Sequence, residues 1–153
     1  MYNRIKIKET KQLFYTSFGK YMGKHRSTHG KKIKWINYPT KIKHIYVRLY
    51  ADQEIAKVMI ELQHKDEEIR GLFFKQFKQL KTAFENMAGK WNWNELSAND
   101  IKLPCSRIEV IKENVNIFDK NTWASVFRFY EENLIKFDIF WVEFKDVFKQ
   151  LED

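Results

Sequence analysis

The residues that could carry out chemistry in this chain gather in a predicted β-hairpin. Strand-like patterns cover residues 44–50 and 54–63, and Asp52 with Gln53 can form a two-residue turn between them. In that register His44 lies opposite Glu61. A carboxylate facing a histidine could form a general acid–base pair, and a nearby arginine would add affinity for an anion. The simpler alternative is a half-exposed sheet face whose charges pair with each other. The predicted outward face carries His44, Tyr46, Arg48, Glu61 and Gln63.

The same hairpin offers part of a nuclease motif. Nucleases with a restriction-endonuclease-like core hold Mg²⁺ with an acid on one strand and an E-x-K sequence on the next, whose Lys assists the attacking water. Here the sequence after Glu61 is Leu62 and Gln63, with Gln where Lys is required, and the nearest earlier acid is Asp52. Glu61, Asp52 and His44 are therefore catalytic candidates only for a degenerate or divergent Mg²⁺-dependent enzyme. Otherwise we expect no cofactor, and the residues favour binding over catalysis.

A basic loop at residues 24–34 is the strongest unusual signal. Phosphate backbones attract clustered cations by releasing condensed counterions, and aromatic rings can stack on exposed bases. We therefore predict a surface for nucleic acid or another acidic partner. The alternative is that these cations only balance acidic residues elsewhere in the domain or across a homodimer. The predicted binding residues are Lys24, Arg26, Lys31, Lys32, Lys34 and Trp35, with Tyr46 and Arg48 of the hairpin.

Charge divides the chain in two. The net charge is +8, but residues 1–50 hold thirteen Lys and Arg against one acid, a local charge of +12. Residues 51–153 hold fifteen Lys and Arg against nineteen acids, a local charge of −4. The basic character therefore describes one part of the surface and not the whole protein.

Composition excludes several classes of protein. The longest uncharged stretch, residues 12–19, is far shorter than a membrane span, so we expect a cytoplasmic protein without a membrane partner. Cys105 is the only cysteine, which excludes an internal disulfide and favours a small buried side chain. His25 and His29 are four residues apart, but zinc needs at least a third ligand, so we predict no metal site.

The elements that position these residues follow from hydrophobic periodicity. Helical spacing covers residues 9–23 and 66–87, and a long amphipathic helix starts at residue 121. Beside the hairpin, strands are predicted at residues 33–38, around Trp91 and Trp93, and at residues 107–111 after a turn near Pro104. The order αβββαββα predicts one α+β domain over residues 1–153, with a mostly antiparallel sheet packed by amphipathic helices. A restriction-endonuclease-like core is the alternative.

The last helix suggests a further hypothesis. Its apolar stripe is rich in aromatic residues and is interrupted near Asp138. The chain holds thirteen Phe, so surplus apolar surface on this helix would favour a self-associating or protein-binding scaffold.

Several short stretches resemble a family of bacterial proteins of roughly 140–150 residues, classed as a domain of unknown function. Its motifs are aromatic and structural, so the resemblance implies no catalytic residues. It does imply an accessory role near nucleic acid, because members resembling this chain follow nuclease-like domains in longer proteins. The stretches that carry the resemblance are Phe14 to Gly19, Lys34 to Tyr38, Lys43 to Tyr46, Leu72 to Phe74, Ser106 to Ile108, and Phe140 with Trp141.

Overall fold

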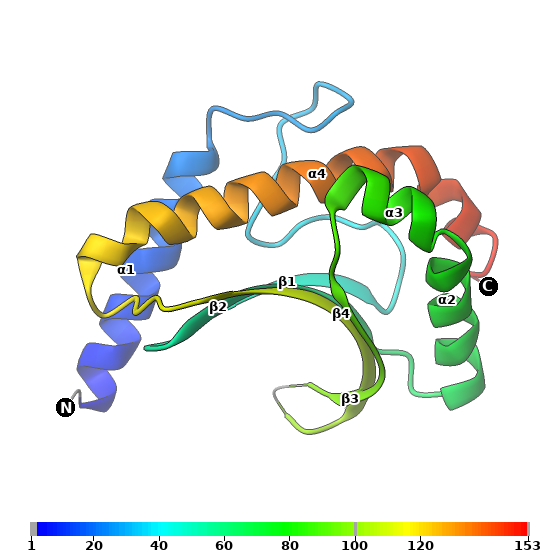
Figure 1. The fold of residues 1–153 in the computed structure, drawn as a ribbon, viewed down its shortest axis with the longest axis horizontal. Coiled ribbons are helices and arrows are strands. Elements are labelled where there is room, and N and C mark those ends of the chain that lie inside the picture. Colours follow the sequence, from blue (N-terminus) through cyan, green and yellow to red (C-terminus); the bar gives the residue numbers. More distant parts are fainter. Residues whose placement is uncertain (1–2, 100, 153) are drawn as a thin grey trace.

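The computed structural model describes residues 3–99 and 101–152 of the chain (Figure 1). The elements of the described part alternate between helices and antiparallel strands, which confirms the α+β class. In chain order they are α1 (Arg4–Met22), β1 (Ile45–Ala51), β2 (Ile55–Leu62), α2 (Glu67–Gln79), α3 (Lys81–Ala88), β3 (Asn92–Ala98), β4 (Pro104–Glu113), a short 3₁₀ helix (Lys120–Thr122) and α4 (Trp123–Lys149).

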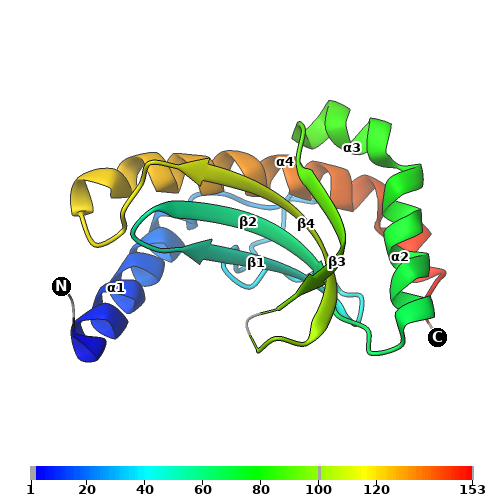
Figure 2. The same ribbon diagram turned by 60° about the horizontal axis from the view of Figure 1, so that its bottom comes forward.

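The sheet has the strand order β1-β2-β4-β3, and every neighbouring pair is antiparallel. Helix α4 lies lengthwise over one face of this sheet, and no helix of the described residues covers the opposite face (Figures 1 and 2). The hairpin of β3 and β4 curls beneath that second face, which we call the open face. The open face carries the outward side chains of the predicted hairpin.

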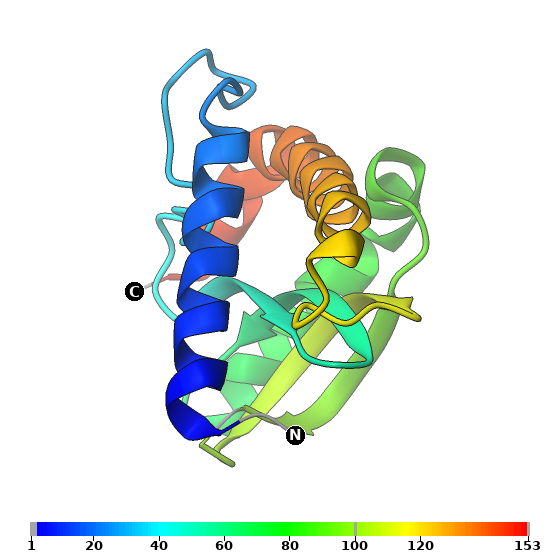
Figure 3. The same ribbon diagram turned by 90° about the vertical axis from the view of Figure 1, so that its left-hand side faces the viewer.

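The core fills the space between α4 and the sheet. Alternate residues of β1 and β2, such as Val47, Val58 and Ile60, are buried against it, as the pattern of the hairpin predicts. Helix α1 lies beside the first half of α4 (Figure 3), and Phe14 and Phe18 pack against aromatic rings of α4. The aromatic residues of α4 are therefore buried or partly buried, and none of them is exposed.

Local sequence explains where α2 begins and ends. The Asp66 carboxylate accepts the backbone N–H groups of Glu68 and Ile69, and two acids occupy the positive end of the helix dipole. The predicted helix 66–87 divides at Leu80, whose backbone ends α2 and starts α3. By contrast, α4 continues without a break through Asp138.

The hairpin forms, but its register differs from the predicted one. Tyr46 lies opposite Glu61, where His44 was expected. The turn is longer by two residues because the Asp52 carboxylate accepts the backbone N–H groups of Glu54 and Ile55, both at 2.8 Å. A shift of two residues keeps each side chain on its predicted face.

Residues 33–38 form a loop, so the strand predicted there is wrong. The apolar residues that indicated a strand are buried from this loop at a spacing of three: Trp35 packs on Tyr38, and the Tyr38 ring packs on Phe137 of α4. Only two strands therefore precede α2. The three-strand order of the restriction-endonuclease-like alternative is not formed among the described residues.

Candidate functional site

The three predicted catalytic residues lie apart. Asp52 is in the turn before β2, whereas Glu61 lies near the other end of that strand. The stretch from Ile55 to Glu61 alone spans about 20 Å at the usual rise of a strand. Asp52 therefore cannot share a bound Mg²⁺ with Glu61. No cluster of three or more metal-ligating side chains occurs among the described residues.

Glu61 is held in a buried ion pair on the open face. Its side chain is 3% exposed, and its Oε2 accepts hydrogen bonds from Nε and Nη2 of Arg107 at 3.0 and 2.7 Å. Gln63 donates to Glu61 Oε1 at 2.9 Å. The glutamine that stands where a nuclease has lysine thus stabilises the carboxylate. The arrangement fixes Glu61 as a structural anion.

His44 lies just before β1 with a φ of 70°, and its ring meets that of His64 edge-on at 4.6 Å. Burial, followed by the nearby positive charges of His64 and Lys43, lowers the pKa of His44. His44 therefore lies beside His64, Lys43 and Glu152, and not beside the Glu61 carboxylate that the predicted register gave it.

The rest of the open face is largely paired with itself. Lys57 lies 3.5 Å from a Glu109 carboxylate oxygen, and the Nε of Arg107 lies 4.0 Å from the same atom. The Arg48 guanidinium stacks 4.5 Å from the centre of the Tyr46 ring, and both side chains are exposed. These two predicted binding residues are therefore on the face opposite α4, whereas the basic loop lies on the helix side.

The basic loop, residues 24–34, is anchored to α4 by a buried acid. Asp138 is 2% exposed and accepts hydrogen bonds from the backbone N and the Oγ1 of Thr28, at 2.6 and 2.7 Å. The Tyr38 hydroxyl donates to the second carboxylate oxygen of Asp138. The Trp141 indole N–H donates to the Thr40 carbonyl at 3.0 Å. Burial and the bond to Asp138 raise the pKa of Tyr38 well above its usual value. The loop thus has a defined path over the helix.

A second anchor lies at the start of the loop. Glu131 of α4 accepts a hydrogen bond from the Tyr21 hydroxyl at 2.7 Å and lies 2.5 Å from His25 Nε2. The bond from Tyr21, opposed by burial and reinforced by His25, lowers the pKa of Glu131. His25 is therefore engaged with a carboxylate, and His29 is exposed. The structure does not bring these histidines together as a metal site.

The five cations of the basic loop point outward. Each is exposed, and the only described carboxylate within 4.0 Å of any of them is Glu131, which lies at that distance from Lys24. A pocket of about 120 Å³ lies between the loop and α4, with Lys31, Lys41 and Lys145 among the residues that line it. The exposed cations are Lys24, Arg26, Lys31, Lys32 and Lys34.

Trp35 does not belong to this surface. It is 4% exposed, and its indole N–H donates to the His25 carbonyl at 3.3 Å. The expectation that it stacks on exposed bases is wrong, because its ring supports the loop from inside. Sequence reasoning also missed Thr28 and Asp138 as anchors. The signal was the interruption of the apolar stripe at Asp138, which marks a buried acid and not a break in the helix.

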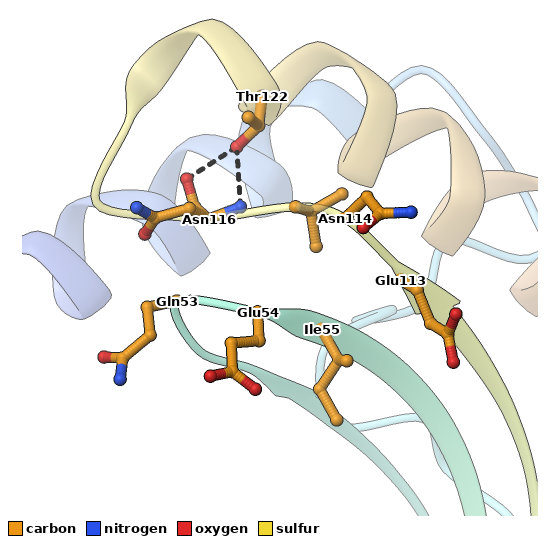
Figure 4. Close-up of a pocket in the computed structure, with 8 residues that line it drawn as sticks. Gln53, Glu54, Ile55, Glu113, Asn114, Asn116 and Thr122 are labelled. Atoms are coloured by element: carbon orange, nitrogen blue, oxygen red, sulfur yellow. Dashed lines mark hydrogen bonds between the residues drawn. The ribbon is translucent and has the colours of Figure 1, made fainter.

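A larger hollow lies at the end of the sheet near the β1–β2 turn, and the polar side chains that line it do not point toward a common centre (Figure 4). It measures about 530 Å³ and lies between the β1–β2 turn and the segment after β4. In Figure 4 the side chains of Gln53 and Glu54 point away from Asn116 and Thr122. The Thr122 hydroxyl donates to the Asn116 carbonyl at 2.6 Å, which ties the segment down locally. This hollow is a structural feature of the turn.

Other surface features bear on the remaining hypotheses. Cys105 is buried, as expected for a lone cysteine, and burial raises the pKa of its thiol. Among the described residues, Ile139 is the one exposed large apolar residue of α4. Three others lie in the β3–β4 hairpin: Leu96 in β3, and Ile101 and Leu103 in the connection to β4. Within the described residues, no helix is both long and apolar enough to span a bilayer.

Comparison with known proteins agrees with the resemblance seen in the sequence. No curated protein and no solved structure matches the chain significantly. One protein family does match: its sequence pattern covers residues 10–145, from the first turns of α1 almost to the end of α4. The chain therefore belongs to the family described as Domain of unknown function (DUF4268).

Proposed function

We propose that this chain is a non-catalytic module that binds the phosphodiester backbone of nucleic acid through the basic loop. The observation that carries the proposal is an anchored loop whose exposed cations Arg26, Lys31, Lys32 and Lys34 have no described carboxylate within 4.0 Å. Cations that only balanced the acidic half of the chain would be expected to pair with it. These four remain available to an external polyanion.

Anchoring increases the affinity that such cations provide. A loop that is already held by Asp138 and Glu131 loses less conformational freedom when it binds than an unattached basic segment would. The acids that anchor it are engaged from inside. Asp138 is buried beneath Thr28 and Tyr38, and its oxygens accept hydrogen bonds from these two residues. Its carboxylate therefore does not face an incoming phosphate.

The composition of the loop favours nucleic acid over an acidic protein. Protein interfaces usually centre on large apolar side chains that become buried. Residues 24–34 contribute none of the exposed large apolar side chains of the described chain, because Ile33 is half buried. Lysine side chains that contact phosphates read no base edges, so we expect binding that depends strongly on salt and little on sequence.

Charge reversal of three lysines tests the proposal. We expect the variant Lys31→Glu, Lys32→Glu, Lys34→Glu to lose most of its affinity for a mixed-sequence DNA duplex. The slope of log Kd against log salt should fall by about 3, one unit for each lost phosphate contact. Fluorescence anisotropy at several salt concentrations measures both quantities, and circular dichroism checks that the fold is retained.

A matched control separates the loop from net charge. Lys75, Lys90 and Lys102 are exposed and lie outside the basic loop, and their reversal changes the net charge by the same amount. We expect the control to keep most of the affinity and the salt slope. Equal losses in the two variants, or no binding of DNA or RNA by the parent at low salt, would refute the proposal. An acidic protein partner would then become the leading occupant of the loop.

A further inference from the structure

We propose that a pocket around Arg70, on the other side of the molecule, binds a phosphate group. The pocket has a volume of about 390 Å³ and lies between His44 just before β1, the residues that follow β2, the start of α2 and the β3–β4 hairpin. It does not depend on the basic loop, because no residue of that loop lines it.

Arg70 is a buried cation without a counter-ion. It is 6% exposed, and it lies on α2 facing the pocket. Its Nη1 donates to the His64 carbonyl at 2.9 Å, and this is the one hydrogen bond of its guanidinium to the described residues. No described carboxylate lies within 4.0 Å of it, which contrasts with Arg107 nearby. Four of its five N–H donors therefore remain for a ligand or solvent.

The other polar residues of the pocket also present donors. The Asn99 side-chain oxygen accepts the backbone N–H groups of Ile101 and Leu103, which leaves its NH₂ group free to donate. Lys65 is exposed and has no described acid within 4.0 Å. Gln63 uses one N–H on Glu61 and keeps the other. Donors from a helix, a loop and two strands' ends suit the tetrahedral arrangement of phosphate oxygens.

Three carboxylates near this pocket are already engaged. Glu61 is paired with Arg107, and Asp66 caps the start of α2. Glu152 bonds to the backbone N–H of Lys43 at 2.8 Å, on the side of His44 that faces the C-terminal end of the chain. None of these acids neutralises Arg70. The exposed Glu95 of β3 lies beside Gly71, the residue after Arg70, and its Oε2 is 3.8 Å from where a Cβ of Gly71 would stand. Burial is the main cause of the lowered pKa of His44, and Lys65 of this pocket adds a smaller effect in the same direction.

Phosphate is the ligand class that this geometry fits. A guanidinium in a partly enclosed pocket forms strong paired hydrogen bonds with phosphate oxygens, and its planar fork matches their geometry. Leu103 and Pro104 form an apolar wall beside the donors, which leaves room for the organic part of a phosphate monoester. The phosphate could belong to a small metabolite or to the end of a polynucleotide, and the test distinguishes the two.

Inorganic phosphate is the first probe. We expect it to bind with a Kd near the millimolar range and to shift the backbone amide signals of Gln63, Lys65, Arg70 and Asn99 in ¹H–¹⁵N NMR spectra. In Arg70→Met the affinity should fall about tenfold or more, because bonds to a charged group are lost. Arg70→Lys keeps the charge but not the planar fork, and should have an intermediate affinity.

The control and the opposing results are direct. Lys75→Met removes an exposed cation from the same helix and should leave phosphate binding unchanged. The variant Lys31→Glu, Lys32→Glu, Lys34→Glu should also retain it, so failure of this site and failure of the basic loop are distinguishable. An unchanged phosphate affinity in Arg70→Met, or amide shifts in the parent confined to residues 24–34, would overturn the proposal even if one variant failed to fold.

A second probe identifies the source of the phosphate. In the variant Lys31→Glu, Lys32→Glu, Lys34→Glu, which removes binding by the basic loop, a dinucleotide with a 5′-phosphate is compared with the same dinucleotide carrying a 5′-hydroxyl. Tighter binding of the phosphorylated form than of inorganic phosphate would assign the pocket to a polynucleotide end. Equal binding of the phosphorylated dinucleotide and inorganic phosphate would assign the pocket to free or small-molecule phosphate. Equal binding of the two dinucleotides would contradict a phosphate site.

Discussion

Asp138 and Arg70 are both buried charges, and the difference between their surroundings distinguishes the two sides of the molecule. Asp138, on the helix side, accepts three hydrogen bonds from Thr28 and Tyr38. Arg70, near the open face, has one carbonyl partner and a pocket. A buried charge whose bonds are all made within the chain stabilises the fold. A buried charge with most of its bonds unmade is better explained by a ligand.

The comparison also explains where the positive charge is available. On the helix side, α4 uses its acids to hold the basic loop from beneath, and the cations point outward. On the open face, the charges of Glu61, Arg107, Lys57 and Glu109 pair within the sheet. One side therefore presents an extended cationic surface, suited to a polymer, and the other keeps a single enclosed cation, suited to one anionic group.

Removal of Asp138 should have the largest effect. We expect Asp138→Ala to lower the free energy of unfolding by about 3 kcal/mol, because it leaves the buried Tyr38 hydroxyl without an acceptor and releases the two hydrogen bonds that hold Thr28. Urea denaturation measures the loss. Asp146→Ala, at an exposed acid of the same helix, should change stability by less than about 0.5 kcal/mol.

Hydrogen exchange localises this effect. The backbone N–H of Thr28, which donates to Asp138, should lose protection in Asp138→Ala while the amides of β2 keep theirs under native conditions. A stability equal to that of the parent would show that the loop does not depend on this acid.

A smaller effect should follow from the pH dependence of the second anchor. The pKa of Glu131 is lowered in the folded protein, so its contribution is complete above the usual value of 4.5 and is lost as the pH falls through the folded pKa. Tyr21→Phe removes the hydroxyl that contributes most to the shift. We therefore expect Tyr21→Phe to be less stable than the parent at pH 6, and this difference to shrink in acid.

Unfolding curves from pH 6 down to pH 3 measure the difference. Asp52 and Glu152 also have lowered pKa values, but the comparison removes their contributions because both proteins carry them. A difference that stayed constant over this range would mean that the Tyr21 hydroxyl stabilises the fold without favouring ionised Glu131.

Much of the fold followed from the sequence because it depends on periodicity. The alternation in residues 44–50 and 54–63 predicted the hairpin and its faces, and the stripe of α4 predicted its length. The strand predicted at residues 33–38 was wrong because a loop that packs on a helix also buries apolar residues, here Trp35 and Tyr38, without the period of two that a strand requires. The hairpin register failed because the side chain of Asp52, and not a Gly, shapes the turn.

The sites were less predictable. The cations of the basic loop were evident from their clustering, and their exposure is the simplest outcome for lysine. Arg70 gave no signal, because a single arginine at the start of a predicted helix is ordinary until the fold buries it with no described carboxylate within 4.0 Å. Pairing of Glu61 with Arg107 depends on β2 lying beside β4, a contact between distant parts of the chain that no local pattern specifies.

The most direct test of the contrast between the two buried charges is the stability of Arg70→Met in buffer free of phosphate and sulfate. A buried cation without a counter-ion costs free energy, so we expect Arg70→Met to be no less stable than the parent, to within about 1 kcal/mol. Added phosphate should then raise the melting temperature of the parent and leave that of Arg70→Met unchanged. A loss as large as that of Asp138→Ala, together with an equal response to phosphate, would contradict the account and make Arg70 a structural residue.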